Sequence, residues 1–112
     1  MMKAIISLGS NINQVENIAK AKEILQGLLH GISFTEAQWT EPVGVVSDKF
    51  LNCLGIFDTE LTKEELKRMF KEIERKMGDS HENHQKAIVL IDIDLLSLGE
   101  EIIKKPVPFT PL

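Results

Sequence analysis

Two aspartates near the end of the chain have the spacing of a metal-binding pair. Asp92 and Asp94 lie in the apolar run LIDIDLL. Residues i and i+2 of a β-strand point to the same side, about 6.6–6.8 Å apart, and at an effective dielectric near 20 two carboxylates at that distance repel by roughly 2.5 kcal/mol. A bound cation would relieve this repulsion. Two carboxylates completed by water and phosphate oxygens are typical of Mg²⁺ in nucleotide chemistry; the alternative is a solvated edge-strand face.

A second candidate for chemistry is the loop over residues 40–50, TEPVGVVSDKF. Pro42 and Gly44 mark it as a connection between two strands. Its valines, of which Val43 is the first, would either wall a flat apolar ligand or pack into the core. Asn52 follows inside an apolar run, where its amide requires partners. It would either hydrogen-bond a ligand ring or hold the loop backbone.

A polar segment, GDSHENHQKA over residues 78–87, contains His81 and His84. It has no regular periodicity, so we expect a mobile loop. The H-x-x-H spacing could serve a transition metal. Histidines on a polar loop are more often solvated, and we expect no metal there.

These residues need elements to position them, and two helices are indicated. The spacing of apolar residues predicts a helix over 62–77, with a capping box formed by Thr62 and Glu65 and a stop at Gly78. A second helix is predicted over 14–30, with Asn13 and Glu16 at its start and Gly31 at its end.

Apolar or alternating runs predict the strands. The predicted ranges are 3–8, 32–40 with a break near Glu36, 50–59, 88–98 and 101–103. The order strand, helix, strand, strand, helix, strand predicts an α+β, ferredoxin-like βαββαβ fold, with an antiparallel sheet and both helices on one face. In the strand 88–98 the isoleucines then face the helices. Both aspartates face the uncovered side of the sheet, where a ligand can bind.

Composition limits the class of protein. A length of 112 residues predicts one domain, 1–112. The net charge of −4 argues against a nucleic-acid partner, which needs a basic surface. No apolar run approaches the ~20 residues of a membrane span. The single cysteine, Cys53, cannot form an internal disulfide, so we expect a cytoplasmic protein. Because Cys53 lies in an apolar run, we expect it in the core.

The motifs together resemble one family. They are SLGSN (7–11), TEPVG (40–44), FLN (50–52), IE…G ending at Gly78, and the D-x-D of Asp92 and Asp94. This ordered set is similar to that of 6-hydroxymethyl-7,8-dihydropterin pyrophosphokinase, which transfers diphosphate from ATP to a pterin in folate biosynthesis. The family fold has a ferredoxin-like core.

The resemblance implies roles for particular residues. Asp92 and Asp94 would hold two Mg²⁺ ions and act in catalysis, with ATP as co-substrate. The pterin would bind to Gly9, Thr40, Pro42, Val43, Phe50 and Asn52. Phe50 would stack on the ring and Asn52 would hydrogen-bond its edge. Glu74 matches a family glutamate near the site.

The chain departs from the family on the ATP side. Val89 occupies the position of a family arginine before D-x-D, and Phe109 occupies the position of a family histidine. Only Arg68 and Arg75 are arginines. From the resemblance we also expect the chain to lack the family's C-terminal segment. Two alternatives to an active enzyme follow: a non-catalytic module that binds a pterin or similar ligand, and a structural domain that forms a homo-oligomer through its open sheet face.

Overall fold

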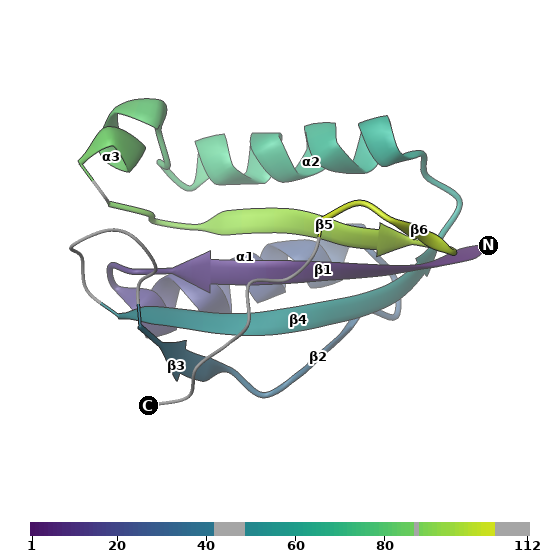
Figure 1. Ribbon diagram of the computed structural model, residues 1–112, viewed down its shortest axis with the longest axis horizontal. Coiled ribbons are helices and arrows are strands. Elements are labelled where there is room, and N and C mark those ends of the chain that lie inside the picture. Colours follow the sequence, from purple (N-terminus) through teal and green to yellow (C-terminus); the bar gives the residue numbers. More distant parts are fainter. Residues whose placement is uncertain (42–48, 87, 105–112) are drawn as a thin grey trace.

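The computed structural model of the protein describes residues 1–41, 49–86 and 88–104. In this part of the chain the elements are β1 (Met2–Ser10), α1 (Gln14–Leu28), β2 (Ser33–Phe34), β3 (Gln38–Thr40), β4 (Phe50–Thr59), α2 (Lys63–Lys76), α3 (His81–Gln85), β5 (Asp92–Leu98) and β6 (Glu101–Ile102). With β2 and β3 counted as one interrupted strand, this order confirms the predicted α+β, ferredoxin-like fold (Figure 1).

The strands form one antiparallel sheet in the order β2-β4-β1-β5-β6, and β3 also pairs with β4. β1 therefore lies at the centre, hydrogen-bonded to β4 on one side and to β5 on the other. Figure 1 shows α1 behind β1 and β4, and α2 running along β5. The central position of β1 lets residues from its two neighbours approach each other across a single strand.

The two faces of the sheet differ in character. Alternate residues of β1, β4 and β5 pack with both helices in one apolar core, which includes Ile6, Leu8, Cys53, Ile93 and Leu95. The intervening residues lie on the opposite side, here called the open face. The open face carries Ser7, Gly9, Phe50, Asn52, Asp92 and Asp94. The predicted division, with isoleucines toward the helices and aspartates away from them, is confirmed.

Helix α2 begins and ends as its sequence predicts. Thr62 Oγ1 accepts a hydrogen bond from the Glu65 amide at 3.1 Å, and Glu65 Oε1 accepts one from the Thr62 amide at 2.9 Å. At the other end Gly78 has φ +93°, a left-handed conformation that favours glycine. Leu66, Phe70 and Ile73 are buried on one face of the helix.

The predicted cap of α1 is wrong. Asn13 has φ 44° and ψ 47°, and its side chain makes no capping hydrogen bond. A capping side chain requires an extended backbone, and the left-handed conformation of Asn13 does not provide it. Asn17 instead holds the turn, since its Nδ2 donates to the Ile12 carbonyl at 2.8 Å. The helix ends at Leu28 rather than His30, before Gly31 at φ +76°.

Other boundaries also differ from the prediction, and the strand over 3–8 in fact extends over Met2–Ser10. The strand over 32–40 is divided into β2 and β3, although Thr35 between them still exchanges hydrogen bonds with the backbone of Leu54. The strand over 88–98 begins only at Asp92, and the strand over 101–103 ends at Ile102. The polar segment over 78–87, predicted to be a mobile loop, contains the short helix α3.

Strand β3 carries the only tryptophan of the chain. Trp39 pairs with Leu51 of β4 and is 42% exposed. None of the helices in the described ranges is long and apolar enough to cross a bilayer.

Candidate active site

Strand register brings the predicted site residues of three strands into one row on the open face. Gly9 of β1 pairs directly with Asn52 of β4 on one side and with Asp92 of β5 on the other. One step along the sheet, Ser7 lies between Leu54 and Asp94. Since neighbouring strands are about 4.8 Å apart, Asn52 and Asp92 are separated by about 10 Å. Residues more than 80 positions apart in the sequence thus share one surface.

Side chains of β4 fill the space over Gly9 in this row. A Cβ atom at this position would lie 2.9 Å from Asn52 Oδ1 and 3.7 Å from Phe50 Cδ1. The first distance is too short for a real contact, so any other residue would displace the Asn52 carboxamide. The glycine therefore allows the amide and the aromatic ring to lie over the backbone of β1.

Asn52 is oriented by Thr40. Its Nδ2 donates to Thr40 Oγ1 at 2.6 Å, and Thr40 is buried at 7% exposure. Thr40 pairs directly with Phe50, so β3 and β4 together hold the threonine, the amide and the ring on one side. Pro42 and Val43, also predicted to line this site, lie outside the described residues.

The two aspartates form a close and partly buried pair. Burial raises the pKa of Asp92 from 3.8 to about 7, and a side-chain hydrogen bond with Asp94 and the charges of Asp94 and Glu74 act in the same direction. Lys104 opposes this shift. A carboxyl group in such surroundings gains strongly from a cation, because a cation compensates both the desolvation and the repulsion.

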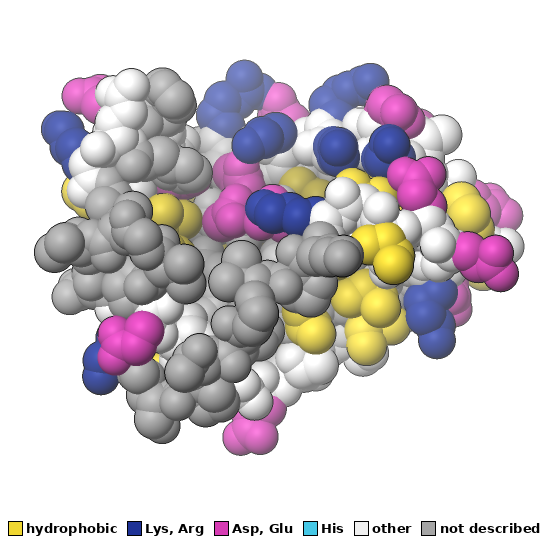
Figure 2. All heavy atoms as spheres, viewed as in Figure 1, with side chains coloured by type: hydrophobic (Ala, Val, Ile, Leu, Met, Phe, Trp, Pro, Cys, Tyr) yellow, Lys and Arg dark blue, Asp and Glu magenta, His cyan; other side chains and the backbone are white. Residues whose placement is uncertain are grey.

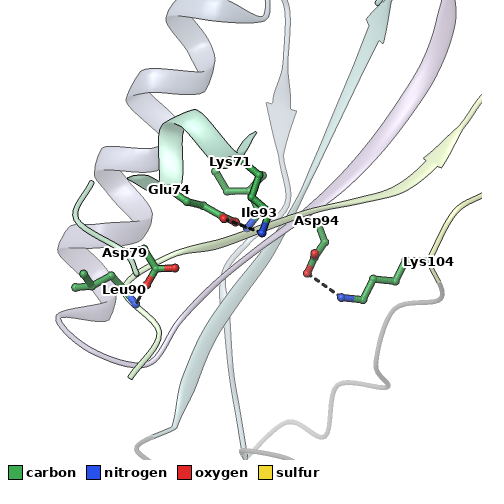
Figure 3. A network of polar contacts seen from close by, with 7 residues as sticks. All are labelled: Lys71, Glu74, Asp79, Leu90, Ile93, Asp94 and Lys104. Atoms are coloured by element: carbon green, nitrogen blue, oxygen red, sulfur yellow. Dashed lines mark hydrogen bonds and ion pairs between the residues drawn. The ribbon is translucent and has the colours of Figure 1, made fainter. Parts of the chain in front are cut away.

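Side chains hold the backbone that leads into β5. The Val89 amide donates a hydrogen bond to Asn11 Oδ1 at 2.7 Å. The Leu90 amide donates to Asp79 Oδ1 at 3.1 Å, and the Ile93 amide donates to Glu74 Oε2 at 2.8 Å. Figure 3 shows the contact of Asp79 with Leu90 and the contact of Glu74 with Ile93. The aspartate pair is therefore carried on a backbone that three other segments fix in place.

Glu74 itself is buried at 6% exposure. Burial raises the pKa of its carboxyl group, while the Ile93 amide and the Lys71 ammonium lower it. Lys71 Nζ lies 3.5 Å from Glu74 Oε1. Because Glu74 accepts a hydrogen bond from the Ile93 amide, it joins α2 to the edge of β5 beside the aspartates.

A cleft of about 320 Å³ lies on the outer side of β5, between that strand and α2. Its lining combines three lysines, one of the aspartates and apolar side chains: Lys67, Phe70, Lys71, Ile93, Asp94, Leu95, Ile103 and Lys104. Figure 2 shows acidic side chains gathered near the middle of the visible face, with basic side chains beside them and over α2. The cleft suits an anionic ligand that also has an apolar part.

Sequence reasoning did not single out the two cleft lysines of α2. Lys67 and Lys71 are four residues apart on α2, and Phe70 lies between them. A spacing of four places side chains on the same helix face. That spacing, next to the apolar stripe of a predicted helix, was the available signal.

The donor set fits Mg²⁺ better than a transition metal. Within the described ranges no group of three or more His, Cys, Asp or Glu side chains is placed to enclose a metal ion. Magnesium commonly binds through one or two carboxylates, with water and substrate phosphates completing its shell. Asp92 and Asp94 offer such a pair.

Comparison with known proteins identifies the family. The sequence profile of 7,8-dihydro-6-hydroxymethylpterin-pyrophosphokinase (HPPK) matches residues 5–110. The chain belongs to the HPPK family. It is also 32% identical over 106 residues to the folate synthesis bifunctional protein of Arabidopsis thaliana, a match that covers 90% of this chain and 22% of that protein. The HPPK resemblance drawn from the motifs is thus confirmed, and members of this family use ATP and Mg²⁺.

Proposed function

We propose that this chain transfers diphosphate from ATP to the hydroxymethyl group of 6-hydroxymethyl-7,8-dihydropterin. The observation that carries the proposal is the position of the Asp92–Asp94 pair. On one side lies the row of Gly9 and Asn52, and on the other lies the lysine-lined cleft. This arrangement suits two substrates that meet at a metal site.

The pterin would bind on the open face. Phe50 offers an aromatic surface for the flat ring, and Gly9 leaves room for the Phe50 and Asn52 side chains to lie over β1. The Asn52 amide, oriented by Thr40, supplies hydrogen bonds to the ring edge. By the family resemblance, Pro42 and Val43 would also contact the pterin.

The chemistry requires charge neutralisation at a phosphate. The pterin hydroxyl oxygen attacks the β-phosphorus of ATP, the bond from that phosphorus to the oxygen bridging the α- and β-phosphates breaks, AMP leaves, and the hydroxyl proton is released. Asp92 and Asp94 would hold two Mg²⁺ ions, which when bound would supply positive charge to neutralise and orient the phosphate oxygens. The protein contributes the fixed carboxylates and the binding surfaces on either side.

On the ATP side we propose that lysines act where the family has arginines. Lys67, Lys71 and Lys104 line the cleft beside Asp94. Lysine is a point charge without the bidentate geometry of arginine. Since the loss of an arginine contact on a transferring phosphoryl group can cost several orders of magnitude, we expect slow turnover.

The test is AMP release from ATP with 6-hydroxymethyl-7,8-dihydropterin and Mg²⁺. We expect release only when all three are present. Asp94→Asn should abolish it, while the matched control Asp58→Asn, on an exposed part of β4, should leave it unchanged. Pterin binding without turnover at high protein concentration would favour the non-catalytic module. Equal loss in both variants would contradict the assignment of Asp94.

The pterin surface has its own test. Gly9→Ala places a methyl group 2.9 Å from Asn52 Oδ1, so we expect at least a tenfold loss of pterin affinity by calorimetry. Gly27→Ala in α1 is the control, because an added Cβ there has no neighbour within 4 Å. Unchanged affinity in Gly9→Ala would place the pterin elsewhere.

A further inference from the structure

Lys104 is held beside the aspartate pair by its own backbone. β5 contains a bulge where it pairs with β1. Ile5 pairs with Ser97 and Ile6 pairs with Leu95, so Leu96 is an extra residue between the two pairs. The Leu96 carbonyl accepts the amides of Ile103 at 2.9 Å and Lys104 at 3.1 Å. The bulge therefore anchors the segment that follows β6 next to the outer side of β5.

From this anchor the lysine side chain reaches the site. Lys104 Nζ lies 3.2 Å from Asp94 Oδ2, and Figure 3 shows the ammonium directed at that carboxylate. The side chains are 55% and 27% exposed, respectively. The contact is thus accessible to solvent ions, and it occupies an oxygen of the carboxylate that the proposed function assigns to a metal.

The other cleft lysines are placed differently. Lys71 pairs with Glu74, and Lys67 lines the cleft from the preceding turn of α2. Lys104 contacts one of the two proposed metal ligands and also lines the cleft for the anionic ligand. It can therefore serve either partner, but a divalent cation on Asp94 would repel its ammonium from that oxygen.

We propose that Lys104 is an exchangeable counter-ion that couples metal binding to phosphate binding. It pairs with Asp94 in the metal-free protein and turns to the phosphates in the cleft once a divalent cation takes that carboxylate. The inference rests on the proposed function, because it needs Asp94 as a metal ligand. Coupling of this kind is reciprocal, so each ligand favours the binding of the other.

The first test measures Mg²⁺ alone by calorimetry, without nucleotide. Lys104→Met removes the competing ammonium and should bind Mg²⁺ roughly two- to five-fold more tightly, the range expected for a partly exposed ion pair. Lys104→Arg retains a competing cation and should resemble the wild type. Lys67→Met, which removes a charge from the same cleft, should leave Mg²⁺ affinity unchanged.

The second test measures an unhydrolysable ATP analogue in excess Mg²⁺. Lys104→Met should bind the analogue several-fold more weakly. The same substitution would thus increase the affinity for Mg²⁺ and decrease the affinity for the nucleotide. The counter-ion role would be overturned if Lys67→Met raised Mg²⁺ affinity as much as Lys104→Met does, or if Lys104→Met did not raise it at all. Either result would leave the proposed function intact. Absence of Mg²⁺ binding in the wild type would overturn the proposed metal site and this inference together.

Discussion

At the scale of single residues, the chemistry of the site follows from the surroundings of Asp92. Its neighbours on the sheet face are another carboxyl group and a glycine, and Glu74 adds a further negative charge. A fold does not gain stability from such an arrangement, because both desolvation and repulsion disfavour the ionised form. The cost at this residue is consistent with a cation-binding role.

This environment predicts a pH dependence of stability. The pKa of Asp92 is raised from 3.8 to about 7 in the folded protein, so over that interval the folded state holds a proton that the unfolded chain releases. The free energy of unfolding should therefore fall as pH rises between these values and level off above them.

The measurement is urea denaturation across that pH range, in the wild type and in Asp92→Asn. The variant has no proton to lose at this position, so its free energy of unfolding should fall less steeply with pH. Glu74, whose pKa is also raised by burial, accounts for part of the remaining slope. Parallel curves would contradict the environment described for Asp92.

Sequence reasoning found both aspartates but not the lysine that pairs with Asp94. The i, i+2 spacing in an apolar run was enough to place Asp92 and Asp94 on one side of a strand. The pairing of Lys104 with Asp94 could not be predicted, because it depends on a bulge at Leu96 that the apolar pattern conceals.

At the scale of elements, the outer side of β5 is held by side chains over its first residues. β1 pairs with its inner side, and β6 reaches only Ser97 and Leu98. The outward amide of Ile93 is instead accepted by Glu74 from α2. An unpaired amide at a buried position costs free energy, so the helix side chain takes the place of a neighbouring strand.

Substitutions at Glu74 should separate its acceptor role from its charge. Glu74→Ala leaves the Ile93 amide without its partner and should lower the free energy of unfolding by about 1–3 kcal/mol. Glu74→Gln keeps a carbonyl oxygen and should lose clearly less. Urea denaturation together with hydrogen exchange at the Ile93 amide measures both effects. An equal loss in the two variants would show that the charge, rather than the hydrogen bond, matters.

The elements differed in how well the sequence predicted them. The boundaries of α2 were predictable because its cap, apolar stripe and terminal glycine all agree. The start of α1 was not, since a side chain of capping type at Asn13 does not reveal its left-handed backbone. The late start of β5 was not predictable either, because the amides of Val89 and Leu90 bond to distant side chains.

At the scale of the whole molecule, the sheet separates stability from chemistry. The helix side holds the apolar core, and the open face holds the glycine, amide and carboxyl groups of the candidate site. The order of elements predicted this separation, because two helices cover only one side of a ferredoxin-like sheet. The particular rows on the open face could not be predicted, since register depends on pairing between strands far apart in sequence.

Substitutions on the two sides should therefore have opposite consequences. Leu66→Ala, at a fully buried position, should lower the free energy of unfolding by about 2–5 kcal/mol and leave Mg²⁺ affinity of the folded protein unchanged. Asp94→Asn should abolish Mg²⁺ binding with a change in unfolding free energy below about 1 kcal/mol. Denaturation and calorimetry on both variants test this, and a large stability loss in Asp94→Asn would contradict the separation.

The half-exposed indole of Trp39 has a practical consequence. The chain contains no tyrosine, so its near-ultraviolet emission arises from this one fluorophore, one residue away from the Thr40 hydroxyl that orients Asn52. Intrinsic fluorescence therefore reports on the β3 edge alone, and it offers a label-free signal for ligand titrations at that end of the sheet.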